Sequence, residues 1–292
     1  MGFARHMQMF RQTKLAKFTM PWILIISALF LTSISDVGLA WIIANSNRDL
    51  GGMIYYFFGA LAVFAYGSLA KRSLRIDFSD KNVLGYLVVC PLAVMSWCVA
   101  LRYTELSLTS FIGGTRPILT VLLSAYILAE SISLSIIISC LLAAVGLYIF
   151  STVPEEFNLL GVAWAFAATF FSSVQSIFVK RVSVATSRLG LIGARALVTG
   201  IVFLVFFSSS AKANSSLDNQ SLGICLASAI AGVGGNFLSL LTIGKLKVSV
   251  FSIIWCLSSV MTYLILVSLN IEAVEAHKVI GGLIISSGAI YC

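Results

Sequence analysis

Three charged side chains lie inside stretches of sequence that are otherwise apolar: Asp36, Arg116 and Arg195. Arg116 is the most informative, because it stands in GGTRPILTVLLSAYILAES, residues 113–131, and Pro117 follows it directly. A charged side chain at the centre of a bilayer costs at least about 2.5–3.5 kcal/mol on insertion scales, so such residues are usually paired or functional. The chemistry that these residues favour is recognition of a charged molecule within a membrane.

Pro117 removes a backbone donor and predicts a kink in the helix, with freed carbonyls near Gly113 and Gly114. Backbone groups freed within a membrane must line a cavity or be buried in protein. Polar and aromatic side chains from other apolar stretches suit the wall of such a cavity. The predicted substrate-binding residues are Asp36, Trp97, Tyr103, Arg116, Gln175, Asn236, Trp255 and Ser258, with Arg195 as a secondary cation.

Depth along the helices predicts a partner for Arg116. Counted at 1.5 Å per residue, Arg116 lies about 13 Å from the outer edge of its stretch and Asp36 about 12 Å from the outer end of its own. An Asp36–Arg116 ion pair is therefore expected. It either tethers two helices or gives way to a substrate anion. Arg195 lies about 9–10 Å from an inner edge, where a long side chain reaching the interface is the simpler interpretation.

Composition places these residues in an integral membrane protein. The 292 residues are 59% hydrophobic and 10% charged, with a mean hydropathy of +1.02, whereas about a quarter of the residues in soluble domains are charged. The apolar runs are continuous, which favours helices over the alternating strands of a β-barrel. Ten transmembrane helices are predicted, at 21–44, 51–70, 83–101, 106–128, 133–152, 159–179, 189–208, 221–243, 248–269 and 278–292.

The distribution of positive charge predicts the orientation. With the N-terminus inside, the inner side holds 13 Lys and Arg residues and the outer side 4. Cytoplasmic loops carry the excess of these residues, so both termini are expected in the cytoplasm. The formal net charge of +8 is then a topology signal rather than a nucleic-acid surface. The expected location is the cell (inner) membrane.

Residues for catalysis or metal binding are not apparent. The six cysteines lack C-x-x-C spacing, and His6 and His277 stand far from any carboxylate cluster. Paired acids and nucleophile–base arrangements are not found either, so neither an enzyme, a metal site nor a cofactor is predicted. Without an ATP-binding motif, transport by this chain would depend on a gradient or on exchange.

The chain contains a weak internal repeat. An offset of 142 residues aligns 106–150 with 248–292 and gives nine identical pairs, among them Glu130/Glu272 and Gly146/Gly288. We interpret both glutamates as caps of the helices that follow them. Because each half holds five helices, the second is expected to be inverted relative to the first, as in many transporters. The predicted halves are 1–152 and 153–292.

The run RPILTVLLSAYILAESISLSIIISCLLAAVGLYIF resembles the proline, helix, glutamate, helix, glycine pattern of EamA-type members of the drug/metabolite transporter superfamily. The second half departs from this pattern, since Ser259 occupies the proline position. The resemblance implies a ten-helix carrier of small metabolites, such as amino acids, amines, nucleotides or sugar phosphates.

Three classes of function follow. The first is a secondary transporter of a small anionic or zwitterionic metabolite, such as an amino acid, working by alternating access. The alternative is a nucleotide-sugar or sugar-phosphate antiporter, or a component of a lipid-linked-sugar flippase, which would need several cations around a phosphate. A channel or membrane enzyme is less favoured. The expected partners are a small-molecule substrate and the lipid bilayer; homodimerisation stays open and nucleic acid is excluded.

Overall fold

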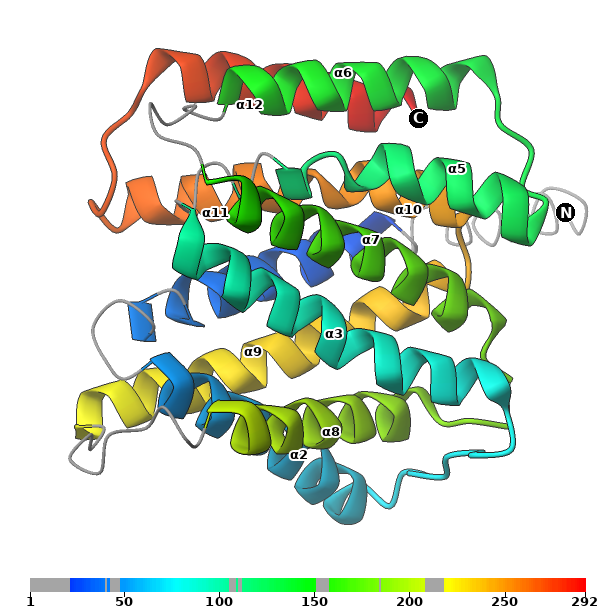
Figure 1. Cartoon of the computed structure of the whole chain (residues 1–292), viewed down its shortest axis with the longest axis vertical. Helices are drawn as coiled ribbons and strands as arrows, with labels where there is room; N and C mark the ends of the chain where they lie inside the picture. Colours follow the sequence, from blue (N-terminus) through cyan, green and yellow to red (C-terminus); the bar gives the residue numbers. More distant parts are fainter. Residues whose placement is uncertain are drawn as a thin grey trace, which may run out of the picture.

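The described part of the chain is helical throughout, without a strand. A computed structural model describes residues 22–39, 41–42, 48–104, 109, 112–150, 158–183, 185–207 and 218–292. Its helices, shown in Figure 1, are Trp22–Leu39, α2 (Arg48–Leu69), α3 (Lys81–Tyr103), α5 (Arg116–Leu128), α6 (Leu134–Phe150), α7 (Leu159–Arg181), α8 (Arg188–Phe207), α9 (Asn219–Ile243), α10 (Val248–Trp255), α11 (Leu257–Ser268) and α12 (Ala276–Tyr291).

Fewer helices than predicted are long enough to cross a membrane by themselves. In the described residues, 7 helical segments have the required length and apolar composition, and α10 and α11 together form one of them. The prediction of ten spans is therefore supported only in part. Helix α5 has 13 residues, α6 has 17 and α12 has 16. The predicted stretch 106–128 differs most, because its helix α5 begins only at Arg116.

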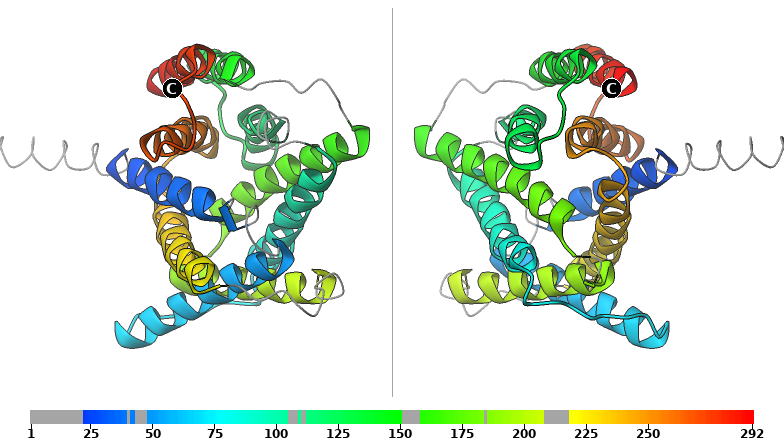
Figure 2. Two further views of the ribbon diagram at one scale, coloured as in Figure 1. Left: turned by 90° about the vertical axis from the view of Figure 1, so that its left-hand side faces the viewer. Right: turned by 90° about the vertical axis from the view of Figure 1, so that its right-hand side faces the viewer.

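The helices pack in three main pairs. Helix α3 lies along α7, α2 along α8 and α6 along α12. Seen along the helices in Figure 2, the α6–α12 pair forms one edge of the molecule and α2 with α8 the opposite edge. Outward-facing side chains such as Leu141, Tyr148 and Leu283 are exposed. An apolar outer surface of this kind suits lipid rather than water.

Glycines allow the α6–α12 pair to approach backbone to backbone. A Cβ on Gly281 would lie 2.6 Å from the carbonyl oxygen of Gly146, and a Cβ on Gly146 would lie 2.8 Å from that of Gly281. The two helices run antiparallel (Figure 1). Small residues at such contacts are typical of helix packing in membranes, where close van der Waals contact replaces the hydrophobic effect.

Candidate substrate site

Arg116 stands at the start of a helix rather than beside a kink within one. Helix α5 begins at Arg116, and Pro117 occupies its first turn, where a missing N–H costs nothing. The prediction that Pro117 kinks a continuous helix is therefore wrong. Ile112 and Gly113 are helical, Gly114 and Thr115 form a turn, and α5 follows. The helical stretch is therefore interrupted before Arg116, and the amides of Thr115 and Ile118 there donate to the carbonyl oxygens of Ile112 and Thr115.

This N-terminus has no side-chain cap. Thr115, the N-cap residue, makes no capping hydrogen bond. Its hydroxyl instead donates to the carbonyl oxygen of Ile112 at 2.7 Å. The positive end of the α5 dipole and its first amide groups therefore carry no counterpart from the Thr115 side chain.

The guanidinium of Arg116 is only partly engaged by the protein. Its Nη2 donates to the hydroxyl of Ser176 at 2.9 Å and to the carbonyl oxygen of Ser172 at 3.3 Å. Its Nε is buried and has no hydrogen-bond partner. Both contacts come from α7, so that helix holds the charge in place while part of the donor fork stays unused.

Arg116 faces a cavity of about 1060 Å³. Drug-sized ligands occupy pockets of about 300–1,000 Å³, so this volume accommodates a phosphorylated sugar and larger molecules. Its wall includes residues from all three main helix pairs as well as from α5, α10 and α11. The predicted residues on this wall are Asp36, Trp97, Arg116, Pro117, Gln175, Arg195, Asn236, Trp255 and Ser258. Tyr103 is not among them; it lies at the end of α3 and is 45% exposed.

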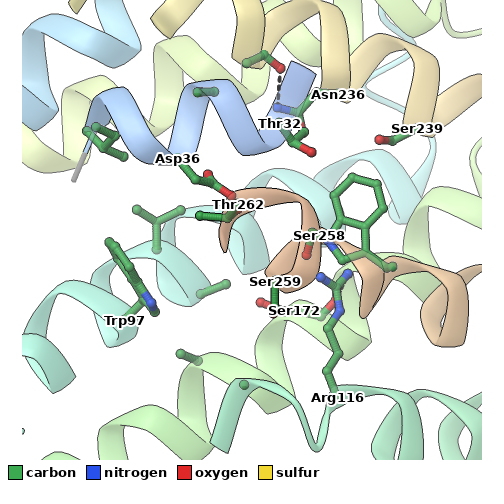
Figure 3. A pocket seen from close by; sticks show the side chains of 18 of the residues that line it. Thr32, Asp36, Trp97, Arg116, Ser172, Asn236, Ser239, Ser258, Ser259 and Thr262 are labelled. Carbon is green, nitrogen blue, oxygen red and sulfur yellow. Dashed lines mark hydrogen bonds between the residues drawn. The ribbon is translucent and has the colours of Figure 1, made fainter. Parts of the chain in front are cut away.

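A second and smaller break lines the cavity near Arg116. Helices α10 and α11 meet at Cys256, which is both the C-cap of the first and the N-cap of the second and has helical dihedral angles. Ser258 and Ser259, in the first turn of α11, lie near the guanidinium in Figure 3. This break could not be predicted from the sequence, because neither glycine nor proline is present at 254–259.

Arg195 contributes a second positive charge to the same cavity. The expectation that it reaches the membrane interface is wrong, because its Nη1 donates to Oδ1 of Asn236 at 2.5 Å. The Asn236 amide in turn donates to the carbonyl oxygen of Gly232 at 2.7 Å. Arg195 and Arg116 lie within electrostatic range of each other. Two like charges in one cavity favour an anion between or beside them.

Asp36 lies on the cavity wall but does not pair with Arg116. Among the described residues no ion pair joins them, and the expected partnership is absent. In Figure 3 the two side chains are separated by the α11 residues Ser258, Ser259 and Thr262. Asp36 lies instead within electrostatic range of Arg195. The equal depth predicted for Asp36 and Arg116 therefore does not bring their side chains into contact.

Several lining residues were not anticipated from the sequence. On the first helix Thr32, Ser35, Asp36 and Leu39 all line the cavity, and their spacing places them on one helix face, a signal that periodicity could have given. The hydroxyls of Ser35 and Tyr55 lie 2.6 Å apart. Further lining residues with polar or aromatic side chains are Trp41, Tyr56, Tyr86, Ser172, Ser176, Ser259 and Thr262.

Comparisons with known proteins decide the family. The sequence model of the Triose-phosphate Transporter family matches residues 13–191, more than half of the chain. The chain belongs to this family. Triose-phosphate Transporter family members are transporters rather than enzymes, and the family is part of the drug/metabolite transporter superfamily expected from the sequence. The narrower EamA assignment remains a prediction. No curated protein matches the chain.

A solved structure shares the fold of this Triose-phosphate Transporter family member. Its title reads only "Crystal structure of protein", and it superposes with a TM-score of 0.80 at 18% identity. The match covers 94% of this chain and 96% of the other. The family and the apolar helices together establish a membrane transporter that crosses the bilayer several times.

Polar contacts join helix ends at one end of the transporter. Glu130 accepts hydrogen bonds from Val248 N at 2.9 Å and Ser249 N at 3.2 Å, so it caps α10 and not, as predicted, the helix that follows it. Lys180 donates to the carbonyl oxygens of Ile243 at 3.0 Å and Leu246 at 2.6 Å. These bonds tie α7 to the end of α9 and the end of α5 to the start of α10.

At the opposite end, charged residues stand at the cavity wall. Lys278 pairs with Glu272 at 3.1 Å and with Glu275 at 3.2 Å, and its ammonium lies 5.4 Å from the centre of the Tyr263 ring. Glu272 is thus an ion-pair partner rather than the predicted cap, because Glu275 is the N-cap residue of α12. Lys278 and Glu272 both line the cavity.

Proposed function

We propose that this chain is a secondary transporter that exchanges phosphorylated sugars, or closely related phosphate monoesters, across a membrane. The observation that carries the proposal is Arg116, whose guanidinium lines the cavity at the start of α5, in the same cavity as Arg195. An arginine at the positive end of a helix dipole is well suited to a phosphate, because both supply positive charge and the guanidinium supplies N–H donors.

The second arginine favours a phosphate over a carboxylate. A phosphate monoester carries a charge of about −1.5 to −2 at neutral pH, and two guanidinium groups in mutual range match this charge. An amino acid carboxylate carries a single negative charge, which one guanidinium group matches. The matching family is named for triose phosphates, which points the same way. The sugar-phosphate alternative is therefore favoured over the amino acid that the sequence first suggested.

Corresponding contacts in the two halves support alternating access through an inverted repeat. A Cβ on Gly146 would meet the carbonyl oxygen of Gly281 and the amide of Ile285. A Cβ on Gly288 would meet the carbonyl oxygen of Ser139 and the amide of Ala143. Ser139 and Ala143 precede Gly281 and Ile285 by 142 residues, the same offset that separates Gly146 from Gly288. Reciprocal contacts between antiparallel helices are what a two-fold axis produces. The repeat boundaries 1–152 and 153–292 remain part of the proposal.

Loop charge supports the orientation, with both termini cytoplasmic. Lys180 and Lys247, which belong to the excess of positive residues, then lie at the inner end, where they donate to Leu246 and Ser131. A C-terminal reporter that is active in the cytoplasm supports this orientation, and one that is active only outside overturns it.

Exchange by purified protein tests the proposed substrate class. Proteoliposomes loaded with inorganic phosphate receive labelled glycerol 3-phosphate, hexose 6-phosphate, a nucleotide sugar or glutamate in separate arms. We expect uptake of the phosphate monoesters that depends on internal phosphate. Uptake of the nucleotide sugar or glutamate alone, or no uptake in any arm, would overturn the proposal.

A further inference from the structure

We propose that Asp36 binds hydroxyl groups of the substrate, so that the site selects a phosphate ester with vicinal hydroxyls and holds it in one orientation. The inference rests on the proposed function, because it assigns the half of the site that Arg116 does not occupy. The cavity then has two chemically different ends: Arg116 binds the anionic group of the substrate, and Asp36 binds its hydroxyl groups.

The carboxylate of Asp36 faces the cavity without a partner. The residue is exposed there, and among the described residues it makes neither a hydrogen bond nor an ion pair. Arg195 lies within electrostatic range, but its donor Nη1 is directed to Asn236. An ionised carboxylate is purely an acceptor, so it requires donors from water or from a ligand. At membrane depth this unmet requirement indicates a functional residue.

The surroundings of Asp36 suit a hydroxyl-bearing carbon chain rather than a phosphate. Like charges repel, so a phosphate is directed away from Asp36 and toward Arg116. Ser35, which precedes Asp36, lines the cavity and its hydroxyl lies 2.6 Å from that of Tyr55, and Figure 3 places Thr262 and Trp97 on the same side of the cavity as Asp36. Hydroxyls beside a carboxylate supply further polar contacts, and an indole ring offers an apolar face to C–H groups.

The test compares two phosphate esters of equal carbon number. Glycerol 3-phosphate has vicinal hydroxyls and propyl phosphate has none. Exchange of each against internal phosphate is measured for the wild type, Asp36→Ala and Asp36→Asn, and each rate is normalised to phosphate self-exchange by the same protein. Asp218→Asn is the matched control, because Asp218 lies at the N-cap of α9, away from the cavity wall, and Asn caps a helix as well as Asp does.

We expect the wild type and the control to prefer glycerol 3-phosphate by about tenfold or more, the worth of hydrogen bonds to a charged group. Asp36→Ala should reduce this preference to about threefold or less, with Asp36→Asn between them because it keeps one acceptor. A preference that survives in Asp36→Ala overturns the inference.

The outcomes separate this inference from the proposed function. If the wild type exchanges no phosphate at all, the proposed function fails. If it exchanges both esters and Asp36→Asn abolishes only the pH dependence of exchange while the preference is retained, Asp36 carries a proton and the present inference fails alone.

Discussion

Two breaks in helical structure line the same cavity and differ in backbone and in chemistry. Helix α5 begins at Arg116 after a turn at Gly114 and Thr115. Helix α11 begins at Leu257 and is separated from α10 by Cys256 alone, whose backbone dihedral angles are helical. The first break presents an arginine and a proline, and the second presents Ser258 and Ser259. The positive charge therefore stands at only one of the two breaks.

Removing the charge at the first break should have the largest effect. Arg116→Gln is expected to lower phosphate-ester exchange by about 10- to 100-fold, because hydrogen bonds to a charged group contribute about 1.5–3 kcal/mol. Arg116→Lys should recover part of the activity, since it keeps the charge but loses the planar fork. Proteoliposome exchange measures both.

Arg75→Gln is the matched control for this change, because Arg75 is exposed and does not line the cavity. Normal exchange by Arg116→Gln, or an equal loss of exchange in Arg75→Gln, would show that the charge at the first break has no specific role in transport.

The close packing of α6 on α12 can be tested at two neighbouring glycines. Gly281→Ala places a methyl group 2.6 Å from the carbonyl oxygen of Gly146, and such overpacking costs about 1–3 kcal/mol. Gly282→Ala meets its nearest neighbour, Val260, at 3.4 Å, which is ordinary contact. We expect a lower melting temperature for Gly281→Ala alone in detergent. Equal melting temperatures for the two variants would contradict the packing of α6 on α12.

The second break should show a smaller effect on transport. Ser258→Ala removes one neutral hydroxyl, so exchange is expected to fall by about 2- to 10-fold. Ser268→Ala, at the exposed end of the same helix, serves as its control. A loss as large as that of Arg116→Gln would show that the two breaks contribute equally, contrary to the comparison.

The smallest effect is expected away from both breaks, at the start of α3. Asp80 accepts hydrogen bonds from Ser183 N at 2.8 Å and Asn82 N at 2.8 Å. These bonds, the one from Ser183 foremost, hold the pKa of the Asp80 carboxyl below its ordinary value. Asp80→Ala should cost about 1 kcal/mol at neutral pH, the usual worth of an N-cap.

The pH dependence of this effect follows from the lowered pKa. The charged form stabilises the fold above the ordinary carboxyl pKa, and that contribution is lost as the pH falls through the lower native pKa. The melting difference between wild type and Asp80→Ala should therefore shrink between about pH 4 and pH 2. Asp80→Asn, which keeps a cap without the charge, should vary less with pH in this range. A difference that grows on acidification would contradict the assignment.

The sequence predicted the helical class and several residues of the cavity wall, but not the contacts between them. Continuous apolar runs predict helices because every backbone group in a bilayer must be satisfied locally. Depth counting placed Asp36 and Arg116 at one level, yet it carries no information on helix rotation, so their separation could not be foreseen. Arg195 was misplaced for the same reason. The break at Cys256 arises from packing, since no local residue type requires it.

Binding of glycerol 3-phosphate in a double-mutant cycle of Arg116→Gln and Arg195→Gln tests whether the two arginines hold the same anionic group. Dissociation constants are measured on folded protein in detergent for the wild type, both single variants and the double variant. If both arginines hold one anionic group, each single variant weakens binding by about tenfold or more and the double variant loses much less than the product of the two. If the losses of affinity in the two single variants multiply in the double variant, or if Arg116→Gln binds as the wild type does, the two arginines do not hold one anionic group.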